Sequence, residues 1–197
     1  SFTAKENLVT IFIGDKGLNL NLLKNGKDLP KSLIIFPGIV ESNNSFNELI
    51  KAIGLPGSSS IVNLKNNYLE FGNVDLLHPV FYDLFSKNKN IKIESPFIHK
   101  YIKILPSGSI KPIISLFDNS IFLGEMNLKK SRVLIFTVSP TEEWSNFPLK
   151  AIFAPLVERS VYYLSANNVN KKSYTAGSQI EINIKNSILP NIRVMLP

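Results

Sequence analysis

Short apolar runs at residues 8–13 and 32–36 dominate the first forty positions, and both are rich in β-branched and aromatic residues. The first run ends at Gly14 and the second at Pro37-Gly38. Continuous apolarity without alternation is typical of strands that are covered on both faces, as in a parallel sheet. The two runs therefore predict buried parallel strands.

Two helical patterns follow. The first lies after the second strand, where apolar residues recur at intervals of three and four: Phe46, Leu49, Ile50 and Ile53. Asn44 or Ser45 would cap this helix, and Gly54 would end it. The second comes after a serine linker at 58–60 and a strand-like run at 61–64. It begins at His78-Pro79 and continues through Val80, Phe81, Leu84 and Phe85.

From residue 97 to residue 123 the pattern changes to short apolar runs separated by turn residues. The runs at 101–105, 112–117 and 121–123 are joined by Pro106-Ser107-Gly108 and by Asp118-Asn119-Ser120. Consecutive runs of this kind predict antiparallel hairpins. An antiparallel extension of a parallel sheet is common in mixed α/β folds.

The run at 132–138 is apolar almost throughout and predicts a further buried strand. A long helical pattern from Phe147 to Leu164 comes next, with Asn146 as its N-cap and Pro148 in its first turn. Pro155 would kink this helix. These elements predict an α/β domain over residues 1–172.

Beyond residue 172 the apolar period becomes two, since isoleucine alternates with polar residues at 180–184 and apolar residues alternate again at 192–196. We expect residues 173–197 to form a β segment. This segment either opens a separate β module or adds a hairpin to the sheet.

The chain of 197 residues has a net charge of +7, from nineteen lysines and three arginines against 15 acidic residues. The lysines are scattered, whereas nucleic-acid-binding proteins usually cluster their basic residues and favour arginine. We therefore expect no nucleic-acid partner. A polyanion site in the lysine-rich stretch at 16–31 is the less favoured alternative. No apolar run approaches the roughly 20 residues that span a bilayer.

The sequence lacks the common catalytic motifs, including the nucleophile elbow, the glycine-rich phosphate loop and the zinc-binding His-Glu-x-x-His. The chain has no cysteine and only two histidines, His78 and His99. We expect no metal site and no cofactor. His78 precedes a proline at a helix start, where its ring would hydrogen-bond local backbone.

Four residues near the end of the strand at 132–138 are candidates for an interaction site. Ser139 closes the strand, where α/β folds often place ligands, but a turn hydroxyl is the simpler role. Trp144 would either anchor the following helix or face a partner. Glu142 and Glu143 could act as acid and base, although carboxylates are also favoured near a helix N-terminus.

The order of these motifs resembles one known family. The segments at 78–81, 112–125, 131–137, 144–149 and 153–157 are similar to the C-terminal half of bacterial BatA-type, aerotolerance-related membrane proteins. The resemblance implies a three-layer, mostly parallel α/β domain like that of class I glutamine amidotransferases and flavodoxins, with an antiparallel hairpin extension. It also implies a periplasmic location beside the inner membrane, with membrane anchors outside this chain.

Class I amidotransferases use a cysteine nucleophile, and this chain has none, so the resemblance implies a non-enzyme. The leading hypothesis is a non-catalytic binding or assembly domain of an envelope membrane protein. Its partners would be proteins or neighbouring domains, and no small-molecule substrate is identified. The alternative is a hydrolase or transferase that uses Ser139, His78 or the Glu142-Glu143 pair.

Overall fold

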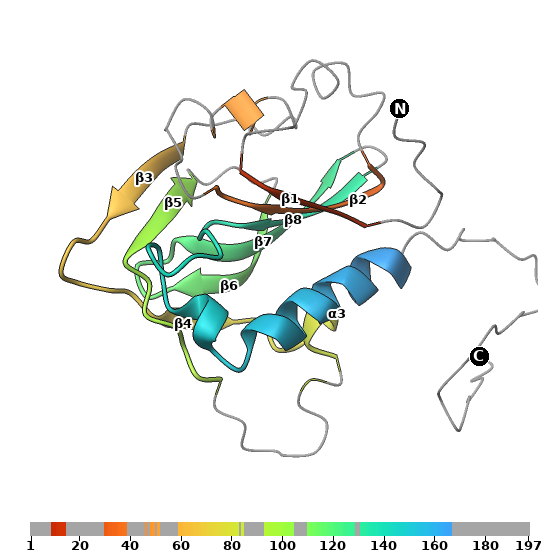
Figure 1. Ribbon diagram of the computed structural model, residues 1–197. Helices are drawn as coiled ribbons and strands as arrows, with labels where there is room; N and C mark the ends of the chain where they lie inside the picture. Colours follow the sequence, from red (N-terminus) through yellow and green to blue (C-terminus); the bar gives the residue numbers. More distant parts are fainter. Residues whose placement is uncertain are drawn as a thin grey trace, which may run out of the picture.

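The computed structural model describes residues 9–14, 30–38, 46, 48–49, 51, 59–82, 84, 93–104, 110–128 and 131–166. Within these ranges the chain forms a six-stranded mixed sheet, a two-stranded sheet, an α-helix at 153–166 and further helical residues at 46, 48, 49 and 51 (Figure 1). The larger sheet has the order β1 (Thr10–Ile13), β2 (Ser32–Phe36), β8 (Ser131–Phe136), β7 (Ile121–Leu128), β6 (Lys111–Leu116) and β4 (Phe71–Val74). The predicted α/β class is confirmed.

The parallel part of the sheet consists of β1, β2 and β8. Its centre is fully covered, because every residue of β2 is buried. Such a strand needs apolar side chains on both faces, which is why its sequence is a continuous apolar run. The predicted parallel strands at 8–13 and 32–36 and the predicted buried strand at 132–138 are therefore present. The predicted burial of the first is wrong, because β1 is an edge strand in which Phe12 is buried and the other residues are exposed.

The antiparallel part adds β7, β6 and β4 beyond β8. The predicted turn between β6 and β7 is present, with Asn119 in a left-handed conformation at φ 65°. The backbone N–H of Ser120 donates to Asp118 Oδ1 over 2.9 Å, which stabilises the turn. In this arrangement β6 points in the same direction as β1, β2 and β8.

Two strand predictions are wrong in detail, and one strand was not predicted. The run at 101–105 forms no hairpin with the next run, because β5 (Lys100–Ile104) pairs instead with β3 (Ser59–Asn63) in the smaller sheet. Ser59 and Ser60 lie within β3 rather than in a linker. The short strand β4 was not predicted, since Phe-Gly-Asn-Val has neither alternation nor a continuous apolar run.

The helices are shorter than the sequence pattern predicts. Among the described residues just after His78, the helical part is a 3-10 turn, η1 (Pro79–Phe81), and Tyr82 and Leu84 lie in turns. The long pattern after Asn146 divides into a 3-10 turn, η2 (Phe147–Leu149), and the helix α3 (Phe153–Ala166). Pro155 lies in the first turn of α3, where a proline fits without a kink.

Asn146 precedes η2, but its side chain makes no cap. It accepts a hydrogen bond from the Phe97 N–H over 2.8 Å instead, so it holds a neighbouring segment.

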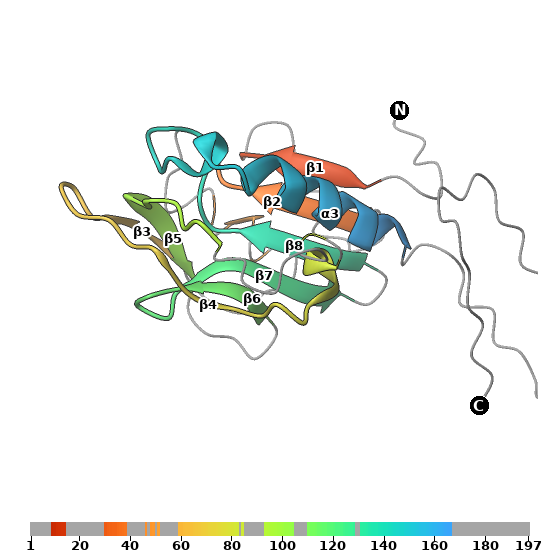
Figure 2. The ribbon, with the colours of Figure 1, turned by 90° about the horizontal axis from the view of Figure 1, so that it is seen from below.

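Helix α3 runs along one face of the large sheet, over β2 and β8 (Figures 1 and 2). Phenylalanine rings fill part of the interface beneath it. The ring of Phe136 stacks on Phe36 with the centroids 4.2 Å apart, and Phe147 contacts both Phe122 and Phe153 edge-on. Offset and edge-to-face ring contacts of this kind contribute beyond simple area burial.

Part of the predicted helix at 46–53 is also present, since residues 46, 48, 49 and 51 are helical and Phe46 and Leu49 are buried. The predicted strands at 180–184 and 192–196, and hence the proposed boundary at residue 172, lie outside the described residues.

Candidate functional site

The structure places the four candidate residues after β8 in very different environments. Trp144 is fully buried, and its carbonyl oxygen accepts hydrogen bonds from the backbone N–H groups of His99 (2.9 Å) and Lys100 (3.0 Å). Lys100 Nζ lies 4.5 Å from the centre of the tryptophan ring. Trp144 thus joins the loop after β8 to the start of β5, as an anchor would.

Ser139 is also fully buried, and its Oγ accepts a hydrogen bond from the Thr141 hydroxyl over 3.4 Å. Glu142 and Glu143 are exposed. Among the described residues, the side-chain hydrogen bonds of His78 go to Glu125 and Val80 rather than to Ser139, Glu142 or Glu143. The structure therefore does not join these candidates into a catalytic group.

The sequence-based interpretation missed a buried titratable group with three side-chain partners, Glu125 on β7. Tyr163 on α3 donates its hydroxyl proton to Glu125 Oε1 over 2.6 Å, and Arg132 Nε lies 3.3 Å from the same oxygen. His78 Nε2 lies 3.3 Å from the other carboxylate oxygen. A lone acidic residue inside the apolar run of β7 was the sequence signal for this cluster.

The hydrogen bonds define the tautomer of a neutral His78 ring, and the surroundings shift the pKa values of Glu125 and Tyr163. The Val80 N–H donates to His78 Nδ1 over 3.2 Å, which leaves the proton of a neutral ring on Nε2, facing Glu125. Burial alone would raise the pKa of Glu125, but the hydrogen bonds from His78 and Tyr163 and the charge of Arg132 hold it below its usual value. Burial and the adjacent carboxylate raise the pKa of Tyr163 to about 12.

The position of the network favours a structural role. It lies near Ser131 and Arg132, where the parallel strand β8 begins, whereas α/β folds bind ligands at the carboxyl ends of such strands. All polar atoms of Glu125 have partners, and His78 and Glu125 are buried. Since the network links η1, α3, β7 and β8, it fixes the helices on the sheet.

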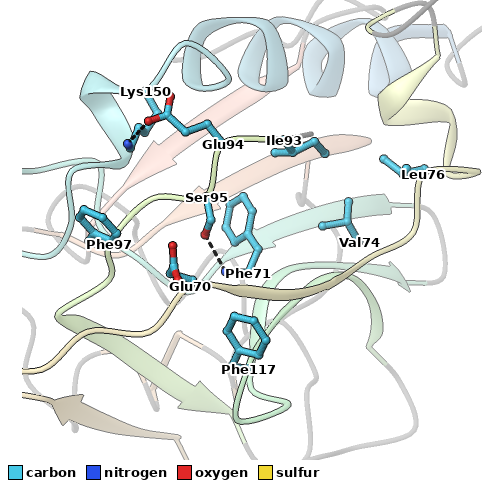
Figure 3. A pocket seen from close by; sticks show the side chains of 10 residues that line it. All are labelled: Glu70, Phe71, Val74, Leu76, Ile93, Glu94, Ser95, Phe97, Phe117 and Lys150. Carbon is cyan, nitrogen blue, oxygen red and sulfur yellow. Dashed lines mark hydrogen bonds and ion pairs between the residues drawn. The ribbon is translucent and has the colours of Figure 1, made fainter. Parts of the chain in front are cut away.

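A second feature is a groove of about 730 Å³ beside β4, the edge strand at the antiparallel end of the sheet (Figure 3). Its walls come from four separate parts of the chain, which explains why no single sequence motif marks it. The lining residues are Glu70, Phe71, Val74, Leu76, Ile93, Glu94, Ser95, Phe97, Phe117 and Lys150.

The segment at 93–97 forms one wall of the groove. Ile98, the residue just after this segment, forms an antiparallel bridge with Leu69, two residues before β4. The Phe71 N–H also donates to Ser95 Oγ over 2.7 Å, so a side-chain oxygen accepts this hydrogen bond in place of the backbone carbonyl of another strand. Across the groove, Lys150 forms an ion pair with Glu94, and its Nζ lies 5.3 Å from the ring centre of Phe97.

Large exposed apolar side chains gather around this groove. Phe117 is 67% exposed and Phe97 is 37% exposed. The ring of Tyr68 packs on that of Phe97, with the ring centroids 4.4 Å apart. Leu76 lines the groove, and Leu149 is the neighbour of Lys150 in the chain; both are exposed. Gathered apolar exposure is more informative than single exposed residues, because soluble domains usually keep such patches for binding.

The described residues contain no group of three or more histidine, aspartate and glutamate side chains that could hold a metal ion. None of the described helices has the length and apolarity needed to cross a membrane.

Comparison with known proteins shows the fold alone. No family model matches the chain, and no curated protein matches it. The chain is similar to a solved structure, the cytoplasmic protein STM3548 from Salmonella typhimurium, with a TM-score of 0.55 and 14% identity over 79% of this chain and 70% of that one. It also matches the cytoplasmic protein STM1381 from Salmonella typhimurium LT2, with a TM-score of 0.47 and 17% identity over 81% and 69% of the two chains.

These findings correct the resemblance drawn from the sequence. The structural neighbour with a TM-score of 0.55 is described as a cytoplasmic protein, and no family model supports a BatA-type membrane protein. The identification as a BatA-type protein is therefore wrong, as are the predictions of an envelope membrane protein and of a periplasmic location that depended on it. Most of the segments that carried the resemblance lie in β6–β8, η2 and α3, so they reflect the packing of the fold rather than a function.

Proposed function

We propose that this chain is a non-catalytic protein-binding domain and that the groove beside β4 is its contact surface. One observation carries the proposal: exposed aromatic and aliphatic side chains gather at this groove, whereas the titratable network around Glu125 is buried and satisfied. The groove is the more suitable place for a partner because it needs no rearrangement of the core.

The openness of the groove favours a protein segment as its occupant. A small-molecule pocket encloses most of its ligand, whereas the Phe97 and Phe117 side chains project far enough to remain 37% and 67% exposed. Aromatic residues at such positions are typical anchors of protein interfaces. The groove also lies beside an edge strand, where partner chains commonly bind.

The non-catalytic part of the proposal is supported by the missing nucleophile. The sequence has no cysteine, and the buried Ser139 has Thr141 rather than a histidine as its hydrogen-bond partner. A hydrolase would need a base within hydrogen-bond reach of its nucleophile.

We also propose the finer form of the fold, a three-layer arrangement like that of class I glutamine amidotransferases and flavodoxins. The buried Phe46 and Leu49 support it. In Figure 1 their short helical segment, in orange, lies on the opposite side of β1 and β2 from α3.

Site-specific photo-cross-linking tests the groove. We would place the photoreactive phenylalanine analogue benzoylphenylalanine at Phe117 and, as a control of similar exposure on α3, at Tyr162. A protein cross-linked from Phe117 and absent from the Tyr162 sample would then be purified. We expect it to bind the wild-type chain and to bind Phe117→Ser about tenfold more weakly, as is usual for an interface anchor.

Two outcomes would contradict the proposal. One is a cross-linked protein that binds Phe117→Ser as tightly as wild type, or no cross-link specific to Phe117. The other is turnover of acyl or amide substrates by the purified chain that Ser139→Ala abolishes.

A further inference from the structure

We infer that the groove recognises a basic side chain, lysine or arginine, of the bound protein segment, with Glu70 as its ion-pair partner and with Phe97 and Phe117 as the aromatic walls on either side. This inference rests on the proposed function, because it names the chemistry of the partner at the same groove.

The strand register places these three residues side by side. The antiparallel bridge between Leu69 and Ile98 puts Glu70 opposite Phe97. On the other side, Phe71 pairs with Leu116, and the Phe117 N–H donates to the Glu70 carbonyl oxygen over 3.1 Å, so Phe117 lies opposite Glu70 as well.

Side chains of directly opposite residues share one face of a sheet, with Cβ atoms about 5 Å apart. The Glu70 carboxylate is therefore flanked by an aromatic ring on each side, as Figure 3 shows. A cation held at this position would meet a carboxylate and two ring faces or edges at once.

The Glu70 carboxylate is available for a partner. Glu70 is half-buried, and within the described part of the chain its carboxylate forms no ion pair or hydrogen bond. A half-buried carboxylate between apolar rings loses hydration without compensation when a neutral segment covers it. A basic side chain removes this cost and restores a charged hydrogen bond.

The chain itself already contains one site of this composition. Lys150 pairs with Glu94 and lies above the Phe97 ring, on the same groove. The same ring can serve a second cation on its Glu70 side. Lysine and arginine also suit the groove through their aliphatic stems, which pack on apolar walls while the charged group reaches the carboxylate.

Binding of three synthetic peptides tests the inference. The probes are acetylated, amidated Ser-Leu-Arg-Val-Ser and its two analogues with Gln or Glu in place of Arg, titrated into the wild-type chain and followed by NMR chemical shifts. We expect the Arg peptide to bind about fivefold to tenfold more tightly than the Gln peptide, since an exposed ion pair and a cation–π contact each contribute less than a factor of ten. The Glu peptide should bind most weakly.

Variants of the chain provide the controls. Glu70→Gln should remove the preference for Arg over Gln, whereas Glu158→Gln, which removes the same charge from the exposed face of α3, should keep it. Glu70→Arg should reverse the preference, so that the Glu peptide binds more tightly than the Arg peptide. Thermal unfolding of each variant verifies that the fold is intact.

The failures of the two proposals differ. If the Arg and Gln peptides bind wild type equally, or if Glu70→Gln keeps the preference, the recognition of a basic side chain is wrong. If Phe117→Ser then still weakens every peptide alike, the groove remains a binding surface without charge selectivity. If no peptide shifts the groove resonances, this inference falls, and the cross-linking result alone decides the proposed function.

Discussion

At the scale of single residues, Gly72 allows β4 to lie close to the end of β6. A Cβ atom at this position would lie 2.7 Å from the Leu116 carbonyl oxygen and 2.9 Å from Phe117 Cα. Both are backbone atoms of the neighbouring strand and turn, so they cannot rotate away as a flexible side chain could. The irregular register of β4 and β6 occurs at this point.

Gly72→Ala should therefore destabilise the fold by about 1–3 kcal/mol, the usual cost of overpacking a close contact. Urea denaturation at neutral pH measures this change. Asn73→Ala is the control, because Asn73 is the exposed neighbour on the same strand. Equal stability of the two variants would show that β6 can move away from β4 at low cost.

At the scale of elements, the helix α3 is attached to the sheet by polar contacts near its C-terminal end as well as by apolar packing. Besides the Tyr163–Glu125 bond, the Ser32 hydroxyl at the start of β2 donates to the Leu164 carbonyl oxygen over 3.1 Å. Carbonyl groups in the last turn of a helix have no partner within the helix. Ser32 provides one from the sheet.

Tyr163→Phe removes the hydroxyl that joins α3 to Glu125 and should cost about 1.5–3 kcal/mol, the range for a hydrogen bond to a charged group. Hydrogen exchange of the α3 amides, together with denaturant unfolding, measures the effect. Tyr162→Phe is the matched control on the adjacent, exposed residue. If both variants exchange at the same rate, the network does not hold the helix.

Elements could be predicted from the sequence where one local signal determines them. The runs of β2 and β8 are continuous and apolar because both faces are covered, and the β6–β7 turn is encoded by Asp118 and Asn119. The pairing of β5 with β3 was not predictable in this way, because it depends on contacts between segments about 40 residues apart. The helix after β8 was predicted too long because apolar spacing does not register the break between Leu149 and Phe153.

The candidate site was even less accessible to prediction from the sequence. Ser139 and Trp144 were chosen for their place after a buried strand, and the structure buries both. Glu70 was not predicted as a site residue, because no motif near it in the sequence indicates a binding site. Its neighbours Phe97 and Phe117 reach it only through strand register.

At the scale of the whole molecule, the structure separates a closed polar network from an open groove. The network lies beneath α3 near the start of β8, whereas the groove lies at the outer strand of the antiparallel part. The network lies at the amino end of β8, away from the carboxyl ends of strands where α/β folds commonly bind ligands, whereas Phe117 of the groove follows the carboxyl end of β6. Similarity of fold by itself assigns no activity to this chain.

Two carboxylates with lowered pKa values, Glu125 and Asp118, predict how the whole fold responds to acid. The pKa of Glu125 is held below its usual value, despite burial, by His78, Tyr163 and Arg132. The pKa of Asp118 is likewise lowered, despite partial loss of hydration, because Tyr101 and Ser120 donate hydrogen bonds to it. In the unfolded chain these carboxyls titrate near 4.5 and 3.8, so between these values and the lower folded pKa values the unfolded state binds more protons.

Stability contributed by the two carboxylates is thus fully present above about pH 5 and decreases as the pH falls through their folded pKa values. Glu125→Gln should cost about 1–3 kcal/mol at pH 7, because it weakens charged hydrogen bonds in a buried site. The difference from wild type should shrink as the pH falls below about 4.5, because the unfolded chain then binds a proton that folded Glu125 does not yet hold. Urea denaturation at a series of pH values measures both curves, with Glu158→Gln as the exposed control. A wild-type curve parallel to that of Glu125→Gln down to pH 3 would mean that the Glu125 carboxylate is no more stabilised in the folded chain than in the unfolded one.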